Sequence, residues 1–395
     1  MPGFEIFGAE ERKEVGDVLE TGVLFRYGFD GVRKGQWKAK TFESEFCRKL
    51  GVQYCHLCSS GTAALSIALA ACGIGAGDEV IVPPFTFLAT IEAVLNAGAV
   101  PVFADIDDTL CLDPKAIETA LTPKTRAVIT VHMCGSMAHI DRISRLCADK
   151  GLVLIEDTCQ TVGGTFQGKA LGTFGQMGCF SFDSVKTITC GEGGAVVTDD
   201  KERYALADAY SDHGHDHIGN DRGLEPHEIL GANYRISELN AAVGVAQLRK
   251  LDQILETQRA NKKALKTALG KFPEITFREI PDDSGDTATF LSFFLPDETR
   301  ARQVAQDLGK AGVDGCFYWY DNNWHYIRKW EHLRRLASPA RLALTLLSPS
   351  PNYEALCLPR SDSIMSRTLS LQIKLSWTQA QLQQRIDAMC GVFNK

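Results

Sequence analysis

The chain has 395 residues, 45% of them hydrophobic, which is enough for two domains with separate cores. Its formal net charge of −7 gives no sign of a nucleic-acid surface or a basic membrane patch. The start of the sequence is acidic and lacks the apolar core of a signal peptide, and no apolar run reaches the roughly 18 residues of a spanning helix. Thirteen scattered cysteines are typical of reduced thiols. We therefore expect a cytoplasmic protein that binds neither nucleic acid nor membrane.

Two short motifs carry metal-ligating residue types. Residues 55–58, CHLC, form a C-x-x-C pattern, and residues 213–217, HGHDH, bring three histidines together. A zinc or redox site at the first motif would need a second cluster or a suitable βαβ context, and the second lacks the spacing of a helical zinc site. Buried structural cysteines and a polar loop are the favoured interpretations, so we expect no metal site.

Short apolar runs alternate with longer amphipathic stretches in the first half of the chain. After an expected helix at 10–20 and another that begins at residue 41, the expected strands are 78–84, 99–107, 125–133 and 152–157. The helices expected between them are 86–98, 113–123 and 141–151. This alternation predicts an α/β fold with a mainly parallel sheet and helices on both faces.

The pattern changes after residue 200. Helices are expected at 201–214 and 236–272, and the second is long enough to link two domains. An α+β pattern follows, with an expected strand at 288–297 and helices at 298–312 and 378–393. We expect a large α/β domain over 1–255, including an N-terminal arm, and a smaller α+β domain over 256–395.

A lone lysine, Lys186, stands in the glycine-rich segment SFDSVKTITCGEGG between two apolar runs. The commonest environment of an arbitrary lysine is a solvated loop, and the alternative is a lysine that forms a Schiff base. In a parallel sheet the ligand lies beyond the carboxyl ends of the strands. The polar residues that directly follow the expected strands therefore decide between the two interpretations.

Three such positions complement the lysine. The turn SSGT at 59–62 precedes a helix, where free backbone N–H groups and the hydroxyls of Ser60 and Thr62 can bind phosphate, although helix capping alone also explains it. Asp157 ends an expected strand, and Phe87 follows a turn where it can stack on a planar ligand. Pyridoxal 5'-phosphate needs these groups: an amine for its aldehyde, a carboxylate for its ring nitrogen and donors for its phosphate.

The order of these motifs resembles that of the DegT/DnrJ/EryC1/StrS family of sugar aminotransferases, which have the fold type I architecture of pyridoxal-phosphate enzymes. The resemblance covers most of the chain and is strongest from about residue 41 to 250. It is carried by SSGTAALSIAL, VPPFTFLATIEAVLNAGAVPVFADID, VLIEDTCQTVGG, CFSFDSVKTITCGEGGAVVT and GANYRISELNAAVGVAQL.

The resemblance implies a role for each matching residue. Lys186 would be the Schiff-base lysine and the acid and base of transamination, Asp157 the partner of the ring nitrogen and Phe87 the stacking aromatic. Gln160 would meet the ring hydroxyl. The phosphate would be held by Ser60, Gly61, Thr62 and Ser181, and by Asn233 of the neighbouring subunit, which implies a homodimer with shared sites. The chain departs from the family pattern at Asp183, Ser184 and Thr187, so the groups that approach the substrate there are not implied.

The substrate rests on a different segment. Residues 315–335 are rich in aromatic and cationic side chains, which pack on sugar faces and bind carboxylates, although a helix that docks the small domain would look similar. We expect Trp319, Arg328 and Lys329 to contact the substrate. Within the family, the chain most resembles enzymes that use L-glutamate to aminate the 8-aldehyde of the acidic sugar Kdo. Their product, 8-amino-3,8-dideoxy-manno-octulosonate, is destined for lipopolysaccharide. A nucleotide-linked keto sugar is the alternative substrate.

Two other classes of protein are weighed against this interpretation. A non-catalytic sensor with this fold would not need an intact lysine, so Lys186 argues against it. A nicotinamide dehydrogenase would need G-x-G-x-x-G after its first strand, and SSGTAAL lacks that pattern.

Overall fold

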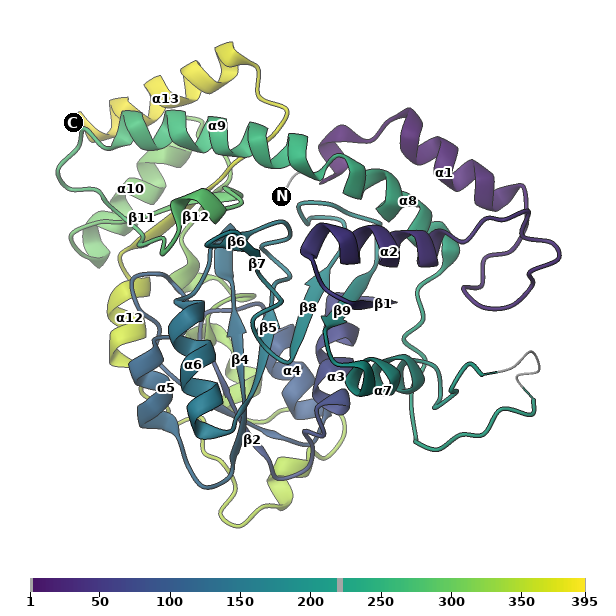
Figure 1. Ribbon diagram of the computed structural model, residues 1–395. Helices are drawn as coiled ribbons and strands as arrows, with labels where there is room; N and C mark the ends of the chain where they lie inside the picture. Colours follow the sequence, from purple (N-terminus) through teal and green to yellow (C-terminus); the bar gives the residue numbers. More distant parts are fainter. Residues whose placement is uncertain (1–2, 219–222, 395) are drawn as a thin grey trace.

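The computed structural model describes residues 3–218 and 223–394, and a mainly parallel seven-stranded sheet forms its centre (Figure 1). The strand order is β1-β9-β8-β5-β4-β2-β3. The strands are β1 (Tyr54–Cys58), β2 (Glu79–Val82), β3 (Val100–Phe103), β4 (Thr125–Val131), β5 (Val153–Asp157), β8 (Met177–Ser181) and β9 (Gly194–Thr198). Neighbouring strands are parallel except that β9 is antiparallel to both β1 and β8. The expected α/β fold with a mainly parallel sheet is confirmed.

The parallel strands bring the predicted site residues to one edge. Because β1, β2, β4, β5 and β8 run in the same direction, their carboxyl ends lie together. Asp157 at the end of β5 is in register with Val131 of β4 and Cys179 of β8. The turns after β1, β2 and β8 therefore open on the same side as Asp157, which is where ligands bind in sheets of this kind.

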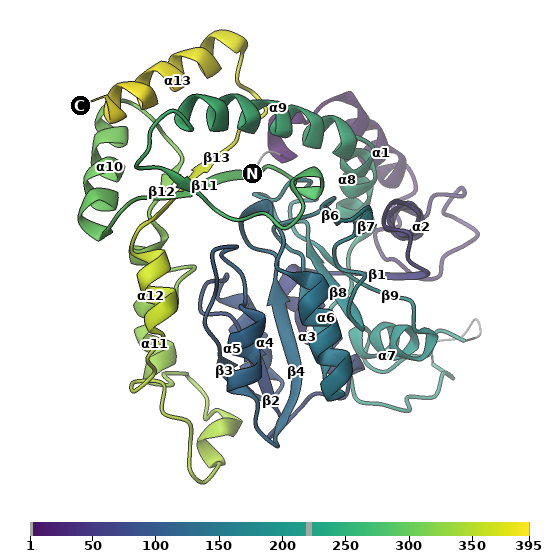
Figure 2. The same cartoon turned by 60° about the vertical axis from the view of Figure 1, so that its left-hand side comes forward.

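Helices cover both faces of this sheet, and alternate strand residues fill two cores (Figures 1 and 2). In β8, Cys179 points to the core under α3 (Gly61–Ala71), whereas Phe180 packs against Phe46 of α2 (Lys38–Leu50). This period of two is the geometry of a strand buried on both faces, which explains why the sequence reads as a continuous apolar run.

The remaining helices follow the expected order. They are α1 (Ala9–Leu19), α4 (Ala89–Asn96), α5 (Pro114–Ala120), α6 (Ile140–Lys150), α7 (Lys201–Ser211), α8 (Glu238–Arg249), α9 (Leu251–Leu269), α10 (Glu298–Lys310), α11 (Glu331–Arg334), α12 (Pro359–Met365) and α13 (Gln379–Phe393). The expectation of one helix over 236–272 is wrong, because Lys250 separates α8 from α9. Its backbone (φ −91°, ψ −6°) stays right-handed but caps α8 instead of continuing it, and its ammonium donates to the carbonyl of Ile6, a contact with a distant segment that local periodicity does not encode.

A smaller antiparallel sheet, in the order β10-β11-β13-β12, lies beside the large one. Its strands are β10 (Thr276–Phe277), β11 (Phe290–Phe294), β12 (Cys316–Phe317) and β13 (Thr368–Gln372), and the hairpin β6 (Thr165–Phe166) and β7 (Lys169–Ala170) stands apart. Helix α9 runs through the domain boundary expected at 255, and that boundary stays a prediction. Part of the expected small domain, from Trp319 to Met365, packs into the core of the large sheet.

Short 3-10 turns connect several of these elements, and two of them contain residues that line the cavity described below. They are η1 (Gly3–Ile6), near the start, and η4 (Trp319–Asp321), after β12.

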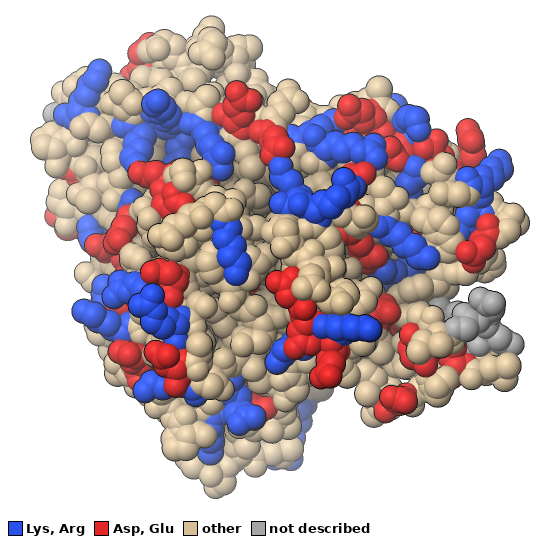
Figure 3. All heavy atoms as spheres, viewed as in Figure 1, with Lys and Arg blue, Asp and Glu red and all other residues tan. Residues whose placement is uncertain are grey.

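On the face shown in Figure 3, acidic and basic side chains gather in small mixed groups. Within residues 3–218 and 223–394, no helix combines the length and apolarity that a bilayer crossing requires. The same residues contain no cluster of histidine, cysteine and carboxylate side chains suited to a metal ion.

Candidate active site

A cavity of about 750 Å³ opens where the carboxyl ends of the parallel strands face the small sheet. Nine of the predicted residues line it: Ser60, Gly61, Thr62, Phe87, Asp157, Gln160, Ser181, Lys186 and Trp319. Phe290 of β11 and Gln372 of β13 close the opposite side. The large sheet thus supplies the predicted cofactor-binding groups, and the small sheet adds a second wall.

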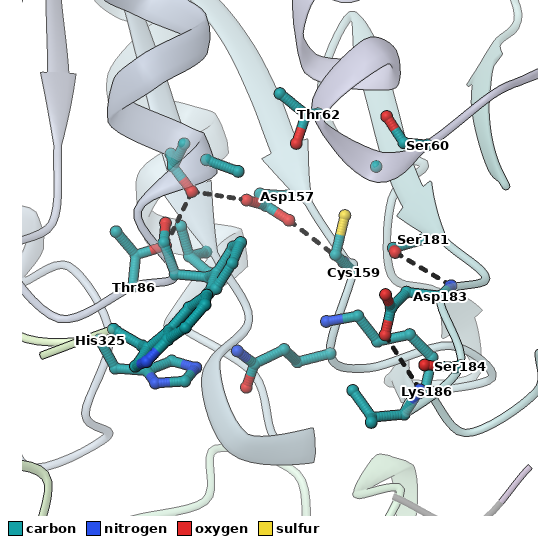
Figure 4. Close-up of a pocket in the computed structure, with 18 of the residues that line it drawn as sticks. Ser60, Thr62, Thr86, Asp157, Cys159, Ser181, Asp183, Ser184, Lys186 and His325 are labelled. Atoms are coloured by element: carbon teal, nitrogen blue, oxygen red, sulfur yellow. Dashed lines mark hydrogen bonds between the residues drawn. The ribbon is translucent and has the colours of Figure 1, made fainter. Parts of the chain in front are cut away.

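Lys186 lies in the loop between β8 and β9, and Figure 4 shows it on the cavity side of that loop. Its backbone N–H donates to the carbonyl of Asp183 at 3.0 Å, and the Asp183 carboxylate accepts from the N–H of Val185 at 2.9 Å. Among the described residues, the Lys186 side chain has no hydrogen-bond or ion-pair partner. The amine is therefore available to a ligand in the cavity.

Asp157 is buried and is held by two short bonds. Its Oδ2 accepts from Thr90 Oγ1 at 2.8 Å, and its Oδ1 accepts from the N–H of Cys159 at 3.2 Å. The Thr90 hydroxyl in turn lies 2.8 Å from that of Thr86 (Figure 4). A fixed carboxylate at the end of a parallel strand can pair with a protonated ring nitrogen.

The amide of Gln160 is oriented by its own carbonyl oxygen, Oε1. This oxygen accepts from the N–H of Cys134 at 3.1 Å, which leaves the Nε2 group as a hydrogen-bond donor toward the cavity. A donor in this place suits the phenolic oxygen of pyridoxal phosphate, as the sequence predicts.

The start of α3 forms an anion cradle against the end of β8. Ser60 is the N-cap, and its Oγ accepts from the N–H of Ala63, while the first N–H groups of the helix have no helical partner. A Cβ at Gly61 would lie 2.7 Å from the Cβ of Ser181 and 3.1 Å from the Sγ of Cys159. Only glycine lets the helix start this close to β8, so the cradle depends on that residue.

Phe87 belongs to an aromatic wall that the sequence did not predict as a unit. Its ring stacks on Trp324, with centroids 5.8 Å apart and planes at 14°, and it lies 5.6 Å from the ring of His325. Trp319 meets His325 edge to face at 4.8 Å and stacks on Phe317 at 4.6 Å. These rings line one side of the cavity.

His325 is a neutral acceptor within this wall. Its Nδ1 lies 3.0 Å from Asn322 Oδ1, which also accepts the N–H of Trp324. Nδ1 therefore carries the hydrogen, and Nε2 keeps its lone pair. Burial, and then the nearby Lys186 ammonium, lower the pKa of His325 to about 4. Figure 4 places His325 across the cavity from Lys186.

The segment that carries these residues comes from the small-domain region, yet it pairs with the loop after β2. The N–H of Thr86 donates to the carbonyl of His325, and the N–H of Ile327 donates to that of Pro84, both at 3.0 Å. Phe85 and Tyr326 form an isolated bridge. The aromatic composition of 315–335 indicated that this segment contacts the substrate. It did not indicate which residues do so, because the long-range pairing with the loop after β2 is what places Asn322, Trp324 and His325 at the cavity.

Three predicted residues lie outside the cavity in this subunit. Asn233 is exposed, although the carbonyl of the next residue, Tyr234, accepts the N–H of Ser59 beside the phosphate cradle. Arg328 is exposed and lies over the ring of Tyr320 at 4.1 Å, and the Lys329 ammonium is 3.5 Å from Asp321. Their predicted roles remain predictions.

The donor set fits pyridoxal 5'-phosphate. The cradle of α3 suits the phosphate, Asp157 the ring nitrogen, Gln160 the phenolic oxygen, Phe87 the ring face and Lys186 the aldehyde. The fold defines the class of protein, an enzyme with the fold type I architecture of pyridoxal-phosphate enzymes, and the residues that line the cavity are compatible with that cofactor.

The chain belongs to the DegT/DnrJ/EryC1/StrS aminotransferase family, whose model matches residues 7–390. It is 39% identical over 306 residues to the L-glutamine:2-deoxy-scyllo-inosose aminotransferase of Streptomyces kanamyceticus, which covers 74% of this chain and 69% of that protein. It is 35% identical over 286 residues to the GDP-perosamine synthase of Vibrio cholerae, with 72% of this chain and 73% of that protein covered.

Solved structures agree with this assignment. The aminotransferase from Psychrobacter cryohalolentis superimposes with a TM-score of 0.84 at 28% identity, over 98% of both chains. NtdA from Bacillus subtilis, solved with bound cofactor PMP, superimposes with a TM-score of 0.83 at 25% identity, over 100% of this chain and 84% of that one. The chain is therefore an aminotransferase with the expected fold.

Proposed function

We propose that the protein is a pyridoxal-phosphate-dependent transaminase that moves the amino group of L-glutamate to a carbonyl sugar, with Lys186 as the residue that bonds the cofactor. One observation carries the proposal: the nine predicted residues that line the cavity, including Lys186, Asp157 and those at the start of α3, come from five separate segments of the chain. When bound, the cofactor supplies an aldehyde that exchanges its partner amine and a ring that takes up electrons.

The residues of the chain would divide the work as follows. Asp157 would pair with the ring nitrogen and keep it protonated, and the bond from Thr90 holds the carboxylate in place. Lys186 would hold the cofactor aldehyde through its Nζ, and the same Nζ, when free, would accept and donate the proton of the substrate carbon, so one amine would be both base and acid. The uncharged rings around His325 would pack against the sugar, and His325 Nε2 would accept a hydrogen bond from a sugar hydroxyl.

For the substrate, we propose the 8-aldehyde of Kdo, giving 8-amino-3,8-dideoxy-manno-octulosonate for lipopolysaccharide. Lys186 is the only lysine or arginine among the described residues that line the cavity, where Asp157, Asp183 and Glu192 also lie, so the carboxylate of the substrate would be placed outside the cavity. An aldehyde at the opposite end of the carbon chain from the carboxylate suits this division. A relative whose name specifies 2-deoxy-scyllo-inosose also supports a substrate without a nucleotide. Trp319 would line the sugar, and the exposed Arg328 and Lys329 would face the acidic end.

A nucleotide-linked keto sugar is the second candidate. The similarity to GDP-perosamine synthase favours it, because the name of that enzyme specifies a nucleotide sugar. The neutral aromatic wall would serve the sugar ring of such a substrate equally well, and its phosphates would lie outside the cavity. The two candidates therefore differ in the group that lies at the cavity mouth.

Two measurements test the proposal. Purified protein loaded with cofactor should show the absorbance of a lysine-bound pyridoxal, and L-glutamate should bleach it. Lys186→Ala should lack both properties, whereas Lys201→Ala, an exposed lysine at the start of α7, should keep them. Full transaminase activity in Lys186→Ala would contradict the assignment of the lysine.

The substrate is tested by mass spectrometry of the products. The protein is incubated with the 8-aldehyde of Kdo or with a keto nucleotide sugar, each with L-glutamate and, separately, with L-glutamine. Amination of the Kdo aldehyde alone is the expected result. Amination of the nucleotide sugar alone would reject the Kdo substrate and leave the transaminase proposal standing.

We also propose a cytoplasmic homodimer in which Asn233 reaches the phosphate of the partner's cofactor. The loop between α7 and α8 that carries Asn233 projects from the body of the molecule (Figures 1 and 2). Ile218, Leu224 and Leu230 of this loop are more than three-quarters exposed, which is unfavourable unless another surface covers them. The thirteen cysteines, all among the described residues, are free thiols, which suits a reducing compartment.

A further inference from the structure

The N-terminal segment lies against the backbone of the proposed catalytic lysine. Its first described residue, Gly3, donates its N–H to the carbonyl of Lys186 at 3.1 Å. A Cβ at Gly3 would lie 3.0 Å from that carbonyl oxygen, 3.0 Å from the N–H of Thr189 and 3.1 Å from the Gln247 amide oxygen. The approach is therefore so close that a side chain at position 3 would push these backbone and amide atoms away by a few tenths of an ångström. We call residues 3–8 the N-terminal strap.

A buried glutamine ties the strap and the lysine loop to the same helix. Gln247 of α8 is fully buried, and its Oε1 accepts from the N–H of Thr189 at 3.4 Å while its Nε2 donates to Glu11 Oε1 at 2.8 Å. The Glu11 Oε2 accepts the N–H of Gly8, the last residue of the strap, at 2.7 Å. One side chain thus connects the loop, through Glu11, to the end of the strap.

Lys250 and a residue that follows the last strand of the small sheet also bind the strap. Lys250 donates to Glu11 Oε1 at 2.6 Å and to the carbonyl of Ile6 at 3.0 Å. Glu5 Oε2 accepts the N–H of Ser376, which follows β13, at 2.8 Å. Figure 1 shows the N-terminus between α9 and the top of the large sheet. The strap is therefore fixed at both ends and along its length.

The strap also reaches the cavity. Phe4 lines it, although 60% of its side chain is exposed to solvent. A phenylalanine held in this position between the lysine loop and solvent forms part of the cavity rim. The strap therefore contacts the site in two ways, through the backbone of Lys186 and through the Phe4 ring.

We propose that the N-terminal strap, with Gln247 as its anchor, is a positioning element for Lys186: it fixes the backbone of the lysine so that the Nζ meets the cofactor aldehyde in one orientation. The inference rests on the proposed role of Lys186. Gln247 and Gly3 touch neither cofactor nor substrate, so they act through the loop. The lysine backbone is held by its own turn at the N–H and by the strap at the carbonyl.

Hydrogen exchange on the cofactor-free protein tests the contact directly. In Gln247→Leu and in Gly3→Val, the backbone amides of 186–191 should exchange roughly tenfold faster than in wild type, the effect of losing about one hydrogen bond. Peptides that cover β5 should exchange at the wild-type rate. The matched controls are Gln253→Leu, at an exposed position of α9, and Gly16→Val, where a Cβ would meet nothing within 4 Å.

Cofactor binding provides a second readout. The dissociation constant of pyridoxal phosphate, measured by absorbance titration, should rise roughly tenfold in both strap variants and not in the controls. Wild-type exchange and affinity in Gln247→Leu and Gly3→Val would overturn the inference.

The two proposals fail separately. Loss of the lysine-bound absorbance in Lys186→Ala together with unchanged exchange in both strap variants would reject the strap and keep the function. A wild-type protein that never shows that absorbance would reject the role of Lys186, and the positioning inference would fall with it.

Discussion

The carboxylate of Asp157 depends on a hydroxyl that takes no part in the chemistry. Thr90→Val keeps the shape of the side chain but removes the 2.8 Å bond to Asp157 Oδ2. We expect the dissociation constant of pyridoxal phosphate to rise roughly tenfold and kcat to fall roughly tenfold, because a hydrogen bond to a buried charge is lost. Thr257→Val, at a half-buried position of α9 far from the cavity lining, is the control. Absorbance titration and steady-state kinetics measure the two values, and equal values in the two variants would contradict the prediction.

His325 offers a different kind of contact, since it accepts a hydrogen bond and carries no charge. In His325→Phe the ring remains and Nε2 is lost, so the KM for the sugar should rise roughly tenfold. The rate at which L-glutamate bleaches the cofactor should change little. Because the pKa of His325 is about 4, the pH–rate profile between about pH 6 and pH 9 should keep its shape in the variant. An acidic limb that is present in wild type and lost in the variant would show that His325 titrates during the reaction.

At the scale of elements, the start of α3 is set by one glycine. Gly61→Ala would place a Cβ 2.7 Å from Ser181 Cβ, and the helix would have to move away from β8. We expect a loss of about 1–3 kcal/mol in the free energy of unfolding and at least a tenfold weaker affinity for the cofactor phosphate. Gly391→Ala in α13, where a Cβ meets nothing within 4 Å, should be neutral or slightly stabilising. Denaturant unfolding and absorbance titration measure both effects.

The loop after α7 is anchored by a charged histidine. Burial opposes the charge of His217, but the Asp208 and Asp212 carboxylates, each 2.9 Å from a ring nitrogen, raise its pKa to about 9. Because this value lies above that of an unfolded histidine, near 6.5, the stabilisation is complete below about pH 6.5 and is lost as the pH rises through 9. We expect the charged form of His217 to contribute about 1–2 kcal/mol to the free energy of unfolding, after allowance for solvent screening.

Thermal unfolding at a series of pH values measures this effect. The Tm of wild type should fall between about pH 7 and pH 10 by more than that of His217→Gln. His227→Gln, an exposed histidine of the same loop, should follow wild type. Parallel curves for wild type and His217→Gln would mean that the ion pairs contribute nothing to stability.

The same elements show how far sequence patterns reach. The strands of the large sheet and the residues at their ends were predictable, because period and turn chemistry are local: Asp157 and Lys186 reach the same cavity as expected. The break at Lys250 and the placement of His325 were not. Both depend on pairing with segments distant in the chain, the strap in one case and the loop after β2 in the other. The direction of β9, antiparallel between β1 and β8, is likewise set by tertiary pairing.

For the whole molecule, the site is a junction between regions far apart in the chain. The large sheet supplies Asp157 and Lys186, the segment after β12 supplies Trp319 and His325, and the strap supplies Phe4. These parts meet only in the folded chain, so cofactor binding should stabilise the whole fold by linkage. A further group, Asn233, lies outside the cavity of its own subunit, which is the arrangement expected if it serves the site of a partner.

Subunit mixing tests that arrangement. If each site takes Lys186 from one subunit and Asn233 from the other, a dimer of Lys186→Ala and Asn233→Ala subunits has one intact site and one doubly altered site. Random pairing of equal amounts makes half of the dimers mixed, so two weak variants should together recover about a quarter of wild-type activity. Lys186→Ala paired with Asp157→Asn should recover nothing, because both residues serve the site of their own subunit. Coexpression with two affinity tags isolates each mixed dimer. Equal activity of the two mixed dimers would show that Asn233 acts within its own chain, because only exchange between subunits distinguishes the pairs.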